Sequence, residues 1–206
     1  MDKKIKGIYS EKIILYLLVL SFLSGELTGS VLSCIVDIDK INGIVDNFLC
    51  NRFYCTFIQT VINSFTSTFI FIILCAVLGM GAFFQLFEAV VPFFYGLGTG
   101  MVFTEMNRSY GFKGLLYSAM MIVPYTLISA ITVIIASREA LIMSNALAEN
   151  ILINHPVERK FDLNLYLTKF LLLVIITAVA SVADGIVTYF FTEFWADLLD
   201  INIYSR

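Results

Sequence analysis

Five long apolar runs restrict most strongly what this 206-residue chain can fold into. They cover residues 13–32, 64–80, 84–103, 115–136 and 165–191. A helix that spans a bilayer needs roughly 20 mostly apolar residues, and backbone groups in hydrocarbon must find hydrogen-bond partners within the segment. We therefore expect an all-α fold, a polytopic helical bundle of five transmembrane helices that forms one integral membrane domain over residues 1–206.

The composition argues against a soluble domain. Hydrophobic residues make up 59% of the chain and charged residues 14%, whereas a soluble domain carries about a quarter charged residues. The formal net charge is −3 and no basic run is present, so we expect no nucleic-acid partner. No A-x-A cleavage site follows the first run, so we expect that helix to be retained in contact with membrane lipid.

The distribution of Lys and Arg predicts the orientation, because cytoplasmic loops carry more of these residues than outer loops do. With the N-terminus inside, basic residues are in excess on the cytoplasmic side. There we place Lys3, Lys4, Lys6, Lys12, Arg138, Arg159, Lys160 and Lys169, and outside we place Lys40, Arg52, Arg108, Lys113 and Arg206. We expect an N-in/C-out protein of the cell membrane.

The segments between the runs are short, with one exception. Residues 33–61 form an outer loop whose second half has apolar residues near helical spacing, which predicts an interfacial helix; an ordinary turn packed on the bundle is the alternative. We expect a tight hairpin at 79–84, a short outer loop at 104–113, and a helix that continues to about Ile153 before Pro156.

Four cysteines are present, and three of them lie in the first outer loop. The loop contains Cys34, Cys50 and Cys55, and Cys75 lies in the second run. A disulfide is allowed on the outer side of the membrane, but the spacing cannot fix a pairing. We predict no bridge.

The glycines of the third run resemble a phosphate-binding loop only superficially. A dinucleotide fingerprint that starts at Gly96 and Gly98 needs its third glycine at residue 101, which is Met, and no strand precedes the motif. Gly96 and Gly100 are four residues apart, as are Gly25 and Gly29 in the first run. Such pairs lie on one helix face and let another backbone approach closely, so they predict helix packing without identifying the partner helix.

Two prolines lie inside apolar runs. Pro124 removes one backbone donor and strains the turn around Met120, which predicts a kink in the fourth helix. Pro92 has a similar position near the start of the third run. These kinks could shape a substrate cavity or only improve packing, and the sequence favours packing.

Three acidic residues lie within predicted helices: Glu26, Glu88 and Asp184. An ionised acid at the middle of a bilayer costs on the order of 3 kcal/mol, so it should face the interior, take a proton or bind a partner. Glu88 is close enough to the cytoplasmic end to reach the interface, whereas Asp184 is deep. We expect hydrogen bonds from Ser and Thr side chains, with a proton relay as the alternative.

The residues needed for hydrolysis within the membrane are missing from the sequence. His155 is the only histidine, which excludes a zinc site that needs two, and Asp184 is the only aspartate in a predicted span, which excludes an aspartyl dyad. We therefore expect no catalytic residue, no metal site and no cofactor.

The order of several motifs resembles the stage II sporulation protein M family of bacterial membrane proteins. The resemblance rests on "GELTGSVLS" at 25–33, "FFYGLGTGMVF" at 93–103, Gly111 and Gly114, and the Val123-Pro124 step. It extends from about Lys12 to Leu198. Tyr125 departs from it, because the family pattern has a polar amide or histidine there. By this resemblance the glycines and Pro124 are structural positions.

The resemblance implies a non-enzymatic scaffold that localises cell-wall hydrolases during engulfment in endospore formation. Its implied partners are the stage II sporulation proteins P and D of the peptidoglycan hydrolase complex, in the mother-cell septal membrane. The alternative is a small membrane transporter or permease subunit that uses the acids within the membrane. The sequence leaves open whether the chain also forms a homo-oligomer.

Overall fold

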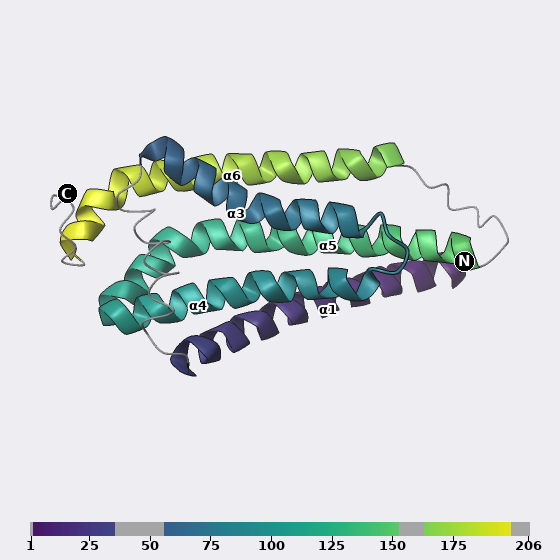
Figure 1. Ribbon diagram of the computed structural model, residues 1–206, viewed down its shortest axis with the longest axis horizontal. Coiled ribbons are helices and arrows are strands. Elements are labelled where there is room, and N and C mark those ends of the chain that lie inside the picture. Colours follow the sequence, from purple (N-terminus) through teal and green to yellow (C-terminus); the bar gives the residue numbers. More distant parts are fainter. Residues whose placement is uncertain (1, 36–55, 153–162, 199–206) are drawn as a thin grey trace.

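The computed structural model describes residues 2–35, 56–152 and 163–198 (Figure 1). These residues form helices and turns and no strand, so the all-α prediction is confirmed for the described part of the chain. The helices are α1 (Asp2–Ile35), α3 (Phe57–Leu78), α4 (Gln85–Tyr117), a π-helix η1 (Ser118–Ile122), α5 (Val123–Leu152) and α6 (Leu163–Leu198). The predicted interfacial helix, Cys50, Cys55 and His155 lie outside the described residues.

Four segments are long and apolar enough to cross a membrane, judged by length and composition. They are Lys12–Ile35, Phe57–Leu78, Gln85–Ala148 and Leu163–Thr192. Many large apolar side chains on these segments are exposed on the outside of the bundle, as a hydrocarbon environment would require. The architecture is therefore compatible with a multi-pass membrane protein.

The predicted outer loop at 104–113 is wrong, because these residues are helical. Helix α4 continues through them and changes direction at Gly111, whose φ of 56° and ψ of −135° are far from helical values. A side chain would strain this conformation, so glycine permits the change of direction without a loop. After it, α5 runs back beside α4 (Figure 1).

The predicted connection between the second and third runs agrees with the structure. Residues 79–84 form the tight hairpin between α3 and α4, with Gly81 donating a backbone hydrogen bond of 2.9 Å to the carbonyl of Leu78. This boundary follows from glycines that stop a helix locally. Helix α5 is described as far as Leu152, and the predicted helix end near Ile153, before Pro156, lies outside the described residues.

Helix α5 is the central element, because it contacts each of the other four helices. Helix α1 packs mainly along α4, and α3 packs mainly along α6, on either side of α5 (Figure 1). Small buried residues on α5, including Ala130, Ala136 and Ala140, let these neighbours approach. The bundle thus consists of two close helix pairs joined through α5.

Candidate functional site

The most closely packed part of the bundle is the contact between α1 and α4, which we call the glycine seam and define by Gly25, Gly29, Gly96 and Gly100. A Cβ atom placed on Gly25 would lie 2.1 Å from the carbonyl oxygen of Phe93, and one on Gly29 would lie 2.2 Å from that of Leu97. Both distances are far inside van der Waals contact, so only glycine fits.

The glycines of α4 meet α1 in the same way. A Cβ on Gly96 would lie 2.3 Å from the carbonyl oxygen of Phe22, and one on Gly100 would lie 2.2 Å from that of Glu26. By contrast, nothing lies within 4 Å of a Cβ on Gly98, which faces away. The two glycine pairs noted in the sequence therefore belong to one interface.

Two serines of α1 add hydrogen bonds across the seam. Ser21 donates to the carbonyl of Ala89 over 2.9 Å, and Ser30, which donates to the carbonyl of Glu26 in its own helix over 2.9 Å, makes a longer contact of 3.4 Å to the carbonyl of Gly100. The bond of Ser21 satisfies a hydroxyl group between two apolar helices. The seam is thus held by close backbone contact and by hydroxyl groups together.

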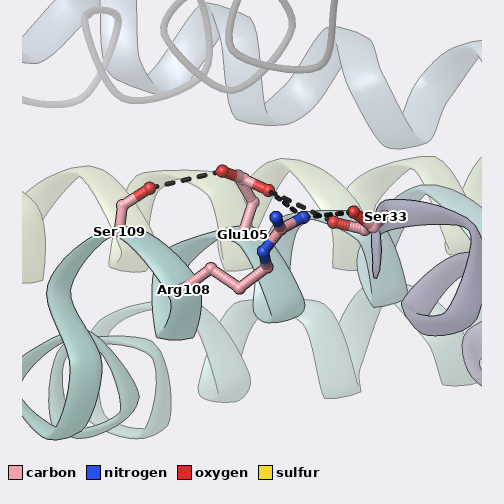
Figure 2. Close-up of polar contacts among 4 residues, drawn as sticks. All are labelled: Ser33, Glu105, Arg108 and Ser109. Carbon is pink, nitrogen blue, oxygen red and sulfur yellow. Dashed lines mark hydrogen bonds and ion pairs between the residues drawn. The ribbon is translucent and has the colours of Figure 1, made fainter. Parts of the chain in front are cut away.

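A polar cluster ties the far end of α1 to α4 (Figure 2). Glu105 is buried, and its carboxylate accepts hydrogen bonds from Ser33 over 3.2 Å and from Ser109 over 3.3 Å. The guanidinium of Arg108 donates to the backbone carbonyl of Ser33 over 2.5 Å and lies 3.9 Å from the Glu105 carboxylate. A cation at the carboxyl end of a helix compensates its unpaired carbonyls and dipole.

The sequence analysis missed Glu105, because it assigned residues 104–113 to a loop. A signal was available in the spacing: Glu105, Arg108 and Ser109 are three and four residues apart, as side chains on one helix face must be. Their partner Ser33 is not near them in sequence, so the contact itself could be found only in three dimensions.

A second polar cluster lies between α3, α5 and α6. The carboxylate of Asp184 is buried and accepts a hydrogen bond from Ser64 over 2.7 Å. The hydroxyl of Tyr125 pairs with that of Thr68 at 2.8 Å and also donates to the carbonyl of Ser64. The predicted hydrogen bonding of the deep acid by hydroxyl side chains is therefore what the structure shows at Asp184.

A small pocket lies beside this cluster, between α6 and the π-helical region. Its volume is about 110 Å³, and Asp184, Tyr125, Met120 and Pro124 are among the residues that line it. Met120 is also largely exposed on the outside of the bundle. The pocket therefore lies between the buried carboxylate and the outer surface of the helices.

The π-helix explains how the bundle accommodates Pro124. Proline has no backbone N–H, so the carbonyl four residues earlier, that of Met120, loses its usual donor. The helix widens here into the π-helix η1, and the N–H of Val123 bonds to the carbonyl of Ser118, five residues earlier. Such single π-turns inside helices are frequent at functional sites.

The remaining residues singled out in the sequence lie apart from one another. Gly114 is buried where the chain turns back, and a Cβ there would lie 2.1 Å from the carbonyl oxygen of Met106. Pro92 is buried within α4. Glu26 is partly exposed on α1. The three predicted acids are on three different helices and do not form one site.

The predicted approach of Glu88 to the interface is wrong. Its side chain is fully buried in the first turn of α4, and neither carboxylate oxygen has a hydrogen-bond partner in the part of the chain that the structure describes. Cys75 of α3 and Tyr166 of α6 lie within electrostatic range of this carboxylate, which therefore faces the interior of the bundle. The described residues also contain no group of three potential metal ligands.

Comparison with known protein families, curated proteins and solved structures gives no match.

Proposed function

We propose that this chain is a non-enzymatic membrane scaffold with five transmembrane spans and an N-in/C-out orientation. The turn at Gly111 supports the count of five, because α4 and α5 run side by side in opposite directions. Helix α5 has 30 residues, and at 1.5 Å per residue it extends about 45 Å, enough to cross a hydrocarbon core of about 30 Å.

In this proposal the scaffold localises cell-wall hydrolases during engulfment, in the mother-cell septal membrane of a sporulating cell. The observation that carries it is the glycine seam. The motifs "GELTGSVLS" and "FFYGLGTGMVF", on which the resemblance to the stage II sporulation protein M family rests, contact each other through Gly25, Gly29, Gly96 and Gly100. Two motifs far apart in the chain thus form one close helix contact, which supports a shared structural role.

The proposed partners are the stage II sporulation proteins P and D. The scaffold would hold a hydrolase by its membrane anchor, through the lipid-facing surface of the bundle. The test replaces the native gene in a sporulating host by one that encodes Gly29→Leu, which forces α1 away from α4, or by one that encodes Gly98→Leu, where the structure has room. We expect mislocalised hydrolase and arrested engulfment with the first variant and normal engulfment with the second.

Two outcomes would contradict the scaffold. The first is normal engulfment in cells that lack the chain altogether. The second is a hydrolase that remains at the septum when membrane levels of the Gly29→Leu protein are normal but α1 no longer packs on α4. Co-purification of the hydrolase with the unmodified chain in mild detergent provides the direct positive test.

The second candidate is a small transporter or permease subunit, and the pocket beside Asp184 favours it. This function predicts that Asp184→Asn abolishes proton-coupled flux in proteoliposomes, because the amide cannot carry a proton. The scaffold predicts that the same variant assembles almost normally, since asparagine still accepts the hydrogen bond from Ser64. Flux by the unmodified chain alone would decide for transport.

A further inference from the structure

Glu88 differs from every other buried carboxylate among the described residues. Glu105 is bound by two serines and Arg108, Asp184 by Ser64, and Glu139 by Arg138 and Lys169. Both oxygens of Glu88 are buried without a hydrogen bond from any described residue. Burial of a charge without a partner is among the most costly arrangements in a protein, so such a group needs a compensating charge or donor.

The side chains near Glu88 do not supply that compensation. Cys75 of α3 and Tyr166 of α6 are both within electrostatic range of the carboxylate. However, the Tyr166 hydroxyl donates to the carbonyl of Ala76 over 3.0 Å, and the Cys75 thiol pairs with the hydroxyl of Ser137 at 3.3 Å. The Tyr166 hydroxyl is therefore engaged elsewhere, and the Cys75 thiol pairs with Ser137 and makes no hydrogen bond to Glu88.

Two cations at this end of the bundle bind another acid. Lys169 of α6 and Arg138 of α5 both contact the carboxylate of Glu139. On the side of α1, the residue next to Glu88, Ala89, receives a hydrogen bond from the neutral Ser21. Among the described residues, the facing helices thus present a thiol, a phenol and one acid that is already paired, but no cation that bonds to Glu88.

The carboxyl end of α3 adds negative electrostatic potential near the Glu88 carboxylate. Ala76, whose carbonyl holds Tyr166, is in the last turn of α3, and Cys75 is one residue earlier. A helix carries a partial negative charge at its carboxyl end, which favours a nearby cation. The ionised carboxylate and the end of α3 both attract positive charge, while the amino end of α4, in whose first turn Glu88 lies, carries a partial positive charge that offsets part of this attraction.

We propose that Glu88 binds one small monovalent cation, either a proton or an alkali-metal ion, between the end of α3 and the start of α4. A divalent metal does not fit the same place, because the described residues offer no cluster of three ligating side chains. The site does not depend on the scaffold function, and a transporter would be only one way to use it. Occupancy neutralises Glu88 and stabilises the packing of the α3–α4 hairpin against α5 and α6.

The test compares the full-length chain with Glu88→Gln in lipid nanodiscs. Thermal unfolding is measured in sodium chloride, potassium chloride and choline chloride at equal ionic strength, and over a range of pH. We expect the midpoint of the unmodified chain to rise by roughly 5–10 °C when the cation saturates the site. A rise with sodium or potassium identifies an alkali ion, and a rise on acidification alone identifies a proton.

In Glu88→Gln the dependence on that cation should be lost, since the neutral amide needs no counter-charge. Asp184→Asn is the matched control: it neutralises a buried acid that is bonded by the hydroxyl of Ser64 and releases no paired cation, so it should retain the dependence. Should Glu88→Gln fail to fold, Glu88→Met offers a side chain of similar length that suits an apolar site. For the proton, the infrared carbonyl band of a buried carboxylic acid should appear in the unmodified chain and disappear in the variant.

Two results would overturn the site. One is an unmodified chain whose unfolding midpoint responds neither to the alkali cation nor to pH and which shows no carboxylic-acid band. The other is a response of equal size in the unmodified chain and in whichever Glu88 variant folds.

Discussion

Replacing one glycine of the seam by alanine should separate α1 from α4, and Gly100→Ala is the most informative choice. Its new Cβ would lie 2.2 Å from the carbonyl oxygen of Glu26, whereas close carbon–oxygen contacts lie at about 3.3–3.6 Å. One helix must therefore move by roughly 1 Å, since both contacting groups are backbone and cannot rotate away. Overpacking of this kind costs typically about 1–3 kcal/mol.

Alanine also favours a helix over glycine, by up to about 1 kcal/mol, and this gain opposes the clash. Gly98→Ala measures the gain alone, because it is on the same helix, two residues away, and has no atom within 4 Å of the added methyl group. We therefore expect Gly98→Ala to be neutral or slightly stabilising. Relative to it, Gly100→Ala should lose about 1–3 kcal/mol.

The assay is reversible unfolding of the purified chain in mixed micelles, with SDS as the denaturant and helical circular dichroism as the signal. The difference between the two alanine variants reports the seam, since the gain in helix propensity is the same at both positions and only Gly100 faces α1. Equal unfolding free energies for Gly98→Ala and Gly100→Ala would refute the close contact between α1 and α4.

Three further variants test other parts of the bundle in the same assay. Gly111→Ala should cost about 1–3 kcal/mol through backbone strain alone, because its φ is 56° and no atom lies within 4 Å of the added Cβ; an unchanged free energy would contradict the backbone geometry. Arg108→Ala should lower the unfolding free energy by about 1 kcal/mol at low salt, and by less at high salt, because it removes the cation at the end of α1. An unfolding free energy at low salt equal to that of the unmodified chain would argue against this role. Tyr125→Phe should cost about 1–2 kcal/mol, because the buried hydroxyl of Thr68 loses its partner, whereas Tyr189→Phe on the exposed surface should change nothing.

Local features of the sequence were sufficient to predict the structure where a residue acts through its own backbone conformation. The hairpin at 79–84 agrees with the prediction because glycine limits helices locally. The spacing of Gly96 and Gly100 indicated a packing face for the same reason. It could not indicate the partner, because four-residue glycine spacing on α1 and on α4 carries no information about which helices meet.

The error at 104–113 arose from treating polar residues as a loop. Glu105 and Arg108 are polar but have partners on α1, which removes the penalty for continuing the helix. The resemblance marked Gly111 only as a structural position, and its φ of 56° makes it the residue at which the chain turns. Neither the distant partner Ser33 nor a backbone dihedral angle can be read from composition or periodicity.

The acids show most clearly where sequence reasoning ends. Asp184 and Glu88 occupy similar apolar contexts in the sequence, yet Asp184 faces Ser64 while Glu88 faces groups whose hydrogen bonds are already engaged. The predicted partner type, a hydroxyl, is therefore correct for one acid and absent for the other. Because a carboxylate bound by a hydroxyl group already has a partner while Glu88 has none among the described residues, we expect the two acids to differ in their response to added cations. Asp184→Asn should leave any dependence on sodium or protons in place, and Glu88→Gln should remove it.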